Sequence, residues 1–275
     1  MKQILAVALL IALCVGFVSA QVDLSKVKDG VYFASEAGFS KSGWKDQVTL
    51  TVAGGKITEV KWNGLGNLPG VTDKKSWAAS GKYGMKKASK LGTEWDQQAL
   101  AAESWLLKSQ DIAYAKFDKD GKTDAISGAS MTTKGFLELV NKALADGPVA
   151  KGVFKKDGYF YAEQAAFDKS SGWKDTAVVV VANGSIVDLL WNGIYKDGTK
   201  KSKLVEAVSG KYGMAKAAKK GEWNVQAQAA EQAIIKAGDP AKIALKPDTT
   251  SDAVSGASIH LTVVAIAIDA LKANR

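Results

Sequence analysis

The chain has 275 residues and a formal net charge of +9, with 37 lysine and arginine residues against 28 aspartate and glutamate residues. Arg275 is the only arginine, and the lysines are interleaved with acidic residues along the chain. Base recognition and bidentate phosphate binding favour arginine, so this composition argues against a nucleic-acid-binding protein. It is typical of a solvated lysine surface, which can also dock an acidic partner or an anionic membrane.

The first 20 residues predict export. A charged start is followed by the apolar run 4–18 and the small residues Ser19-Ala20, the pattern of a cleaved secretory signal. Cys14, the only cysteine, could instead accept a lipid, but Leu13 stands where a small residue is needed. We therefore expect a periplasmic or cell-surface protein, tethered to a membrane only if Cys14 is lipidated. Cleavage after Ala20 would leave a mature chain without disulfides or thiolate ligands.

An internal repeat divides the rest of the chain. SGKYGM at 80–85 returns at 209–214, and DAxSGAS at 124–130 returns at 252–258. The near-constant offset predicts two copies of one domain of ordinary size rather than a solenoid of short units. We place the domains at 21–147 and 148–275, with turn-forming residues at the join.

Each copy is expected to begin with strands. Residues 31–33 favour β-structure, and residues 48–62 alternate apolar and polar side chains on both sides of Gly54-Gly55, which predicts a hairpin. The matching hairpin of the second copy turns at Asn183-Gly184, the strongest short turn signal.

Helices follow the hairpin. The spacing of Ala, Lys, Trp, Leu and Gln predicts helices over 74–91 and 94–108, with Gly92 as the stop between them. Apolar residues at i, i+3, i+4 and i+7 predict a closing helix over 133–144, and over 262–271 in the second copy. The expected fold class is α+β, with two tandem copies of a small domain in which helices pack on an antiparallel sheet.

The segment DAISGASMTT, residues 124–133, leads into the first closing helix. A helix entrance offers unpaired N–H groups and the positive end of the dipole, which attract a phosphate. Gly128 and Ala129 let a ligand approach the main chain, and Ser130 is a good cap. Thr133 would then lie in the first turn with its hydroxyl beside the anion. The pattern predicts a site that holds a phosphate next to an alcohol; a capped helix start with small residues for packing is the alternative.

These residues resemble the motif of FMN-binding domains. That family is shared by the C subunit of sodium-pumping NADH:quinone reductase, the G subunit of Rnf complexes and exported flavoproteins of extracellular electron transfer. There a Mg²⁺-dependent flavin transferase joins the FMN phosphate to the final Thr or Ser hydroxyl as a phosphodiester. The order of elements is similar in both copies, and the tandem arrangement is most similar to that of exported electron-transfer lipoproteins.

The resemblance implies that Thr133 carries covalent FMN, with Mg²⁺ needed only by the transferase. The other site residues that it implies are Asp124, Ser127, Gly128, Ala129, Ser130 and Thr132. The matching residues of the second copy are Asp252, Ser255, Gly256, Ala257 and Ser258, which either bind a noncovalent flavin or remain only as structure. Leu261 fills the acceptor position there and has no hydroxyl, so no phosphoester can form. Thr262 is rotated by about 100° round the helix and is not expected to substitute.

Other candidate residues carry simpler interpretations. His260, the only histidine, is expected at the surface or as a cap, and no second histidine is there to build a metal site. Residues 64–70 look superficially like a nucleotide-binding glycine loop, but their spacing predicts a plain turn. Trp62 and Tyr83 are the aromatic residues predicted to stack on a flavin ring.

Glu103 and Glu231 occupy matching helix positions, and neither has a second carboxylate nearby in sequence. Acid–base catalysis and self-contained catalytic residues are therefore not predicted.

The expected function is that of an exported electron carrier whose FMN exchanges one or two electrons. No Rossmann fingerprint is present, so the expected electron partner is a redox protein or a quinone-linked membrane complex rather than bound NADH. The flavin transferase is the other expected partner. Two alternatives stay open: a secreted flavin-dependent reductase of a small acceptor, and a non-redox flavin-binding or structural module.

Overall fold

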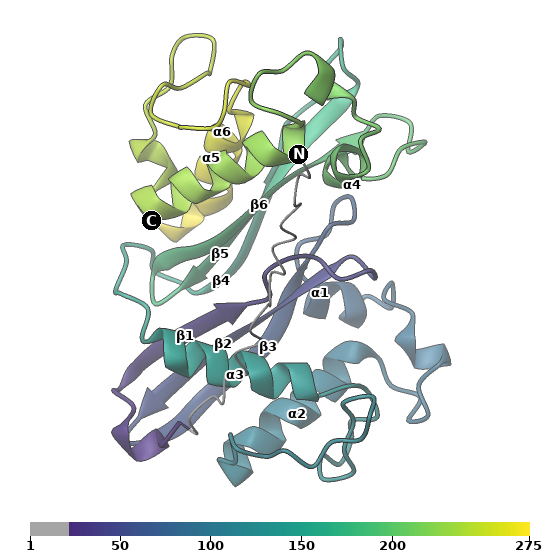
Figure 1. Ribbon diagram of the computed structural model, residues 1–275, viewed down its shortest axis with the longest axis vertical. Coiled ribbons are helices and arrows are strands. Elements are labelled where there is room, and N and C mark those ends of the chain that lie inside the picture. The colour runs from purple at the N-terminus through teal and green to yellow at the C-terminus, as the bar shows by residue number, and fades with distance from the viewer. Residues whose placement is uncertain (1–21) are drawn as a thin grey trace, which may run out of the picture.

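The computed structural model describes residues 22–275 and consists of two α+β units arranged along the long axis of the molecule (Figure 1). The export signal and Cys14 lie outside the described residues. No helix in the described part is long and apolar enough to cross a bilayer. The predicted join at 147–148 lies between the last helix of the first unit and the first strand of the second.

Both units have the same order of three strands and three helices, which confirms the α+β prediction. The first contains β1 (Gly30–Ser35), β2 (Trp44–Ala53), β3 (Lys56–Gly66), α1 (Lys74–Ala79), α2 (Trp95–Ser109) and α3 (Lys134–Asp146). The second contains β4 (Gly158–Glu163), β5 (Trp173–Ala182), β6 (Ser185–Tyr195), α4 (Lys203–Val208), α5 (Trp223–Ala237) and α6 (Thr262–Leu271). Short 3₁₀ turns cover Leu24–Lys26, Met85–Lys87, Met214–Lys216, Pro240–Lys242 and Lys272–Asn274. Each sheet is antiparallel, in the order β1-β2-β3 and β4-β5-β6.

The two hairpins form where the sequence predicts them. Gly54 and Gly55 both have positive φ, and so do Asn183 and Gly184. Two consecutive left-handed residues make the tight turn whose twist matches that of the flanking strands. Glycine and asparagine tolerate this conformation better than other residues, so the hairpin register follows from the turn chemistry.

The predicted helix over 74–91 is wrong beyond Ala79, because α1 has only six residues. Gly81 and Gly84 follow with φ of 75° and 80°, left-handed values that end a right-handed helix. The prediction for 94–108 is confirmed by α2, which starts with a capping box between Glu94 and Gln97.

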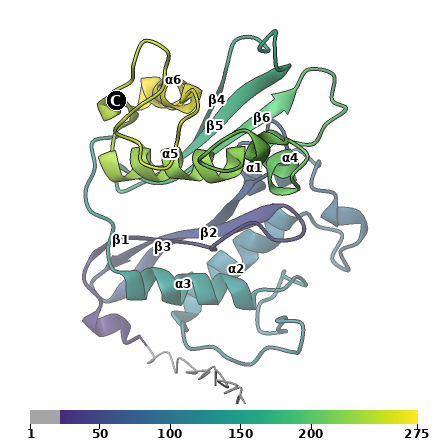
Figure 2. The same ribbon diagram turned by 45° about the horizontal axis from the view of Figure 1, so that its top comes forward.

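The sheets meet face to face, and the long helices cover their outer faces (Figure 2). In the first unit Tyr32, Val48 and Leu50 point towards α2 and α3, whereas Phe33 points towards the second sheet. Strand β5 is buried along almost its whole length, because α6 covers one face and the first unit the other. Its continuous valine run reflects this burial on both faces.

Polar side chains also join the two units. Asp188 on β6 forms an ion pair with Lys45 at 2.5 Å and accepts a hydrogen bond from Gln47 Nε2 at 2.6 Å, both on β2. Tyr159 donates to Gln47 Oε1 at 2.8 Å, and its pKa is raised well above the ordinary value by burial and by nearby carboxylates. Ser202 donates to the carbonyl of Asn67. The predicted turn at 64–70 thus contacts the second unit.

We expect Asp188→Ala to lower the free energy of unfolding by about 2 kcal/mol, because Lys45 and Gln47 lose their partner in a poorly hydrated place. Calorimetry of the mature chain should show a lower and broader transition as the two units uncouple. Lys142→Ala is the control: it breaks an exposed ion pair with Asp146 within α3, which is worth under about 0.5 kcal/mol. Equal effects of the two substitutions would contradict the prediction.

Candidate functional site

The loop before α3 is held by its backbone and by one core side chain. Ile126 is buried in the first core. Gly128 has a φ of 89°, and a Cβ atom there would lie 3.1 Å from Cβ of Ala101 on α2. Glycine is therefore needed both for the left-handed backbone and for the close approach to α2.

Gln98 on α2 fastens the second part of this loop. Its side chain is fully buried, and its Oε1 accepts hydrogen bonds from the N–H groups of Ser130 (2.8 Å) and Met131 (3.1 Å). Its Nε2 donates to the hydroxyls of Ser89 (2.8 Å) and Thr93 (3.0 Å). All four bonds converge on one amide, so this side chain sets the position of the loop relative to α2.

The predicted cap residue is corrected by the structure. Thr133, not Ser130, is the N-cap of α3, and its side chain makes no capping hydrogen bond. The N–H groups of Thr133 and Lys134 both donate to the carbonyl of Gly121. Together with the bonds to Gln98, this occupies four N–H groups at the helix entrance; among the described residues those of Thr132 and Gly135 have no acceptor. Within residues 22–275 the N–H groups of Ser127 and Gly128 make no hydrogen bond, and both residues are exposed.

Thr133 has an unusual environment. Only 1% of its surface is exposed, and its Oγ1 is buried without a hydrogen-bond partner among the described residues. An unpaired buried hydroxyl costs free energy, and such groups are rare in folded proteins. Leu261 occupies the same position at the start of α6 and is equally buried. The second copy therefore fills with an apolar side chain the place where the first copy keeps a hydroxyl.

A hollow of about 770 Å³ lies beside the loop. Most of the predicted site residues line it, namely Asp124, Ser127, Gly128, Ala129 and Ser130. Thr132 and Thr133 do not; Thr132 donates its hydroxyl to the carbonyl of Asp120. The volume is in the range of small-molecule and cofactor sites.

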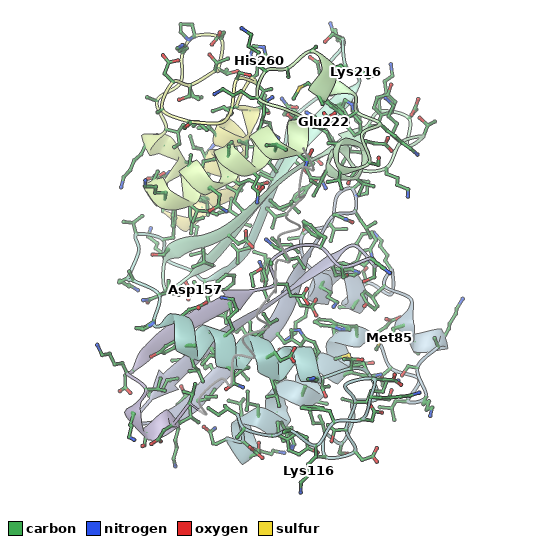
Figure 3. All side chains as sticks on the ribbon, viewed as in Figure 1. Met85, Lys116, Asp157, Lys216, Glu222 and His260 are labelled. Atoms are coloured by element: carbon green, nitrogen blue, oxygen red, sulfur yellow. The ribbon has the colours of Figure 1, made fainter. Side chains whose placement is uncertain are left out.

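The rest of this wall was not predicted from the sequence. It consists of Met85, the segment 88–91, Gln98, Lys116, Asp118, Lys122, Thr123, Ile126 and Met131. Lys90, Lys116 and Lys122 make it basic beside Asp118 and Asp124. Figure 3 shows Lys116 and His260, which belong to the two copies, near opposite ends of the molecule. The sequence signals for these residues were the return of Met85 as Met214 and of Gln98 as Gln226.

The aromatic candidates lie elsewhere. Trp62 is 3% exposed and stacks on Phe136 with 5.0 Å between ring centres. Tyr83 packs between Trp44 and Trp95, and burial raises its pKa to about 12. Neither ring lines the hollow, so the structure does not bring the predicted stacking residues to it.

A buried lysine organises these rings. Lys74 Nζ lies 4.1 Å from the ring centre of Trp95 and 2.7 Å from Asp46 Oδ1. Burial lowers its pKa despite the nearby carboxylate. The second copy repeats the arrangement with Lys203 and Asp175, so it belongs to the fold rather than to the loop.

The second loop keeps the backbone contacts of the first. Ser258 N–H donates to Gln226 Oε1 at 2.8 Å, and a Cβ atom on Gly256 would lie 3.1 Å from Cβ of Ala229. Thr262 turns its hydroxyl away to Asp175 Oδ2 at 2.6 Å, which agrees with the expectation that it does not replace the acceptor.

The other residues of the second loop lie at its surface or edge. Asp252 and Ser255 are exposed, Ala257 is half-buried, and Asp252 pairs with Lys246 at 2.6 Å. His260 is exposed, with Nδ1 2.5 Å from the carbonyl of Asp248.

The entrance to α3 thus combines a loop of small residues, a hollow lined by three lysines, and the unpaired buried hydroxyl of Thr133. Residues 43–145 match the family model described as FMN-binding domain. Over these residues the chain is similar to FMN-binding domains.

Two solved structures are similar to part of the chain. An NMR structure of a Clostridium thermocellum protein has 42% identity and a TM-score of 0.35, over 43% of this chain and 91% of the other. A crystal structure of a Clostridium perfringens protein has 25% identity and a TM-score of 0.34, over 44% of this chain and 88% of the other. No curated protein matches the chain.

Proposed function

We propose that the protein is an exported electron carrier with FMN joined through its phosphate to Thr133 Oγ1. The supporting observation is the hydroxyl of Thr133, which is buried without a partner in the first copy and replaced by Leu261 in the second. A hydroxyl that costs free energy where it lies is explained if it serves as an attachment point.

The residues that line the hollow suit this group, and Thr133 is the N-cap of the helix that follows the lining loop. The hollow holds a molecule of cofactor size, and Lys90, Lys116 and Lys122 supply positive charge for a phosphate. The free N–H groups of Ser127 and Gly128 offer hydrogen bonds to phosphate oxygens. When bound, FMN supplies one- and two-electron redox chemistry, while the chain fixes its position and its exposure.

Attachment of FMN to Thr133 requires a flavin donor with an activated phosphate. Thr133 Oγ1 loses its proton and forms a bond to the FMN phosphorus, and the phosphoanhydride bond of the donor breaks. With FAD as the donor the leaving group is AMP, and a transferase with Mg²⁺ supplies the catalysis. Because Oγ1 is covered in the folded chain, the transferase must act while the segment 130–133 is open. Closure afterwards shields the ester from water.

An electron carrier needs a partner that delivers electrons to its flavin or takes them from it. The excess of lysine suits an acidic redox partner or an anionic membrane surface. The second unit, with Leu261 at the acceptor position, contributes no second covalent flavin.

The test is the mass and absorption spectrum of the chain, coexpressed with a flavin transferase, denatured and washed. We expect one FMN-sized increment per chain and a flavin spectrum that stays with the polypeptide. A colourless chain, or one with two increments, would contradict the proposal. Stopped-flow reoxidation by an acidic redox protein should slow as salt rises, whereas steady turnover of a small soluble acceptor would favour a reductase instead.

A further inference from the structure

A second hollow lies where the two units meet, away from the loop before α3. Its volume is about 480 Å³. The first unit contributes Phe39 and Lys45, and the second contributes Leu189, Leu204, Val208 and Glu231, among others. The walls are mainly apolar, and the volume again suits a small molecule.

Only two charged side chains line this hollow. Oε1 of Glu231, on α5, accepts a hydrogen bond from the backbone N–H of Trp191 at 2.7 Å. Among residues 22–275 its Oε2 has no hydrogen-bond partner. Lys45 on β2 pairs with Asp188 at 2.5 Å and keeps further N–H groups for a ligand. The described lining thus has two charged groups, beside apolar side chains and the uncharged polar residues Ser40, Asn67, Ser209, Asn224 and Gln228.

The first copy shows what this site would be without a ligand. Glu103 occupies the position of Glu231 and also accepts from a backbone N–H, that of Trp62, at 2.5 Å. There Lys75 closes the site with an ion pair at 2.6 Å. The second copy has Leu204 in place of Lys75, so the carboxyl loses its cation and the hollow gains an apolar wall. The first copy shows that the fold is compatible with this ion pair. The fold therefore does not explain why the second copy lacks it.

The protonation state of Glu231 defines the chemistry of a ligand. Burial raises its pKa to about 8; Asp188 on β6 raises it as well, while the Trp191 hydrogen bond and Lys45 on β2 lower it. The residues that α4 and the segment 37–40 contribute to the hollow are uncharged. At neutral pH the carboxyl is mainly protonated, and it can donate a hydrogen bond.

We propose that this hollow binds a small, neutral, mainly apolar molecule through a carbonyl oxygen that accepts a hydrogen bond from the Glu231 carboxyl. Lys45 offers a second donor to the same oxygen or to another acceptor on the molecule. An ammonium ligand is disfavoured because the protonated carboxyl has no charge for it. The site is independent of a flavin at Thr133, so either assignment can fail without the other.

The first test titrates the mature chain with 1-tetralone, an apolar ketone, and follows the backbone amide signals by NMR. We expect saturable shifts at Leu204, Glu231 and Phe39, and much weaker ones with tetralin, which lacks the carbonyl. Leu204→Lys recreates the ion pair of the first copy and should weaken binding at least about tenfold. The reciprocal Lys75→Leu should leave binding unchanged. Tetralone shifts that are absent, or that survive Leu204→Lys, would overturn the proposal.

A second variant tests the same site in case Leu204→Lys does not fold. Val208 is 68% exposed at the rim, so Val208→Trp should block the hollow without affecting the core. The affinity should also fall as pH rises, by about tenfold per pH unit above the Glu231 pKa, because the donor proton is lost. Glu231→Gln keeps an N–H donor and should bind without this dependence. The proposal would be overturned if binding to Glu231→Gln fell with pH as steeply as binding to the unmodified chain. Full binding in Val208→Trp would overturn it as well.

Discussion

Thr133→Val is expected to abolish covalent flavin attachment and to leave the fold intact. Valine has nearly the shape of threonine but no nucleophilic oxygen, so the phosphoester cannot form. The hydroxyl that is removed has no partner and makes no capping bond. Its loss should therefore leave the free energy of unfolding unchanged or raise it by up to about 1 kcal/mol. Intact mass and thermal unfolding of the same preparation check both parts.

Two neighbouring substitutions serve as controls for this experiment. Thr133→Ser keeps the acceptor oxygen and should retain the FMN increment. Thr132→Val removes an adjacent hydroxyl that donates to the carbonyl of Asp120, and it should keep the flavin at a cost of about 1 kcal/mol. An FMN increment that persists in Thr133→Val would disprove the assignment. If the FMN increment were lost in both Thr133→Val and Thr132→Val, the loop rather than one oxygen would govern attachment.

The hairpins and the long helices could be predicted because their signals are local. Asn183-Gly184 needs only its own backbone preferences to turn, and α2 carries its own capping box. The segment after Ala79 misled the prediction because its lysines and alanines favour a helix, while Gly81 and Gly84 adopt left-handed conformations. Helix propensity is worth a few tenths of a kcal/mol per residue, which is too little to outweigh these glycines.

The site was only partly predictable, because much of it depends on contacts between distant residues. The motif located the loop, and five of the predicted site residues do line the hollow. The occupied N–H groups of Ser130 and Met131 could not be foreseen, since their acceptor Gln98 lies more than 30 residues earlier. The burial of Thr133 likewise follows from packing, and not from the pattern of small residues.

Divergence between the copies separates what the fold needs from what a ligand needs. Gln98 and Gln226 both accept from the N–H group of the matching serine, and Gly128 and Gly256 both lie close to an alanine of the preceding long helix. Two of the differences between the copies concern the proposed sites, namely Thr133 against Leu261 and Lys75 against Leu204. Each difference changes a polar group that the shared architecture does not require. The proposed attachment site is therefore in the first unit, whereas the proposed carbonyl site lies where the two units meet.

Gln98→Leu is expected to lower the free energy of unfolding by about 3–4 kcal/mol and to release the loop before α3. Leucine fills a similar volume but leaves the N–H groups of Ser130 and Met131, together with the hydroxyls of Ser89 and Thr93, without their partner. Several unpaired groups at a buried position give a loss of this size. Amide exchange at Ser130 and Met131 should accelerate about a hundredfold.

The matched substitution Gln226→Leu isolates the role of the first loop. It removes the bonds to Ser258 and to the carbonyl of Gly221, and should cost about 2–3 kcal/mol without changing exchange at Ser130. If attachment at Thr133 requires an open segment, Gln98→Leu should be flavinylated faster than the unmodified chain, and Gln226→Leu should not. Unchanged exchange at Ser130 and Met131 in Gln98→Leu would show that other contacts hold the loop. Faster exchange without faster flavinylation would show that access to Thr133 does not limit the transfer.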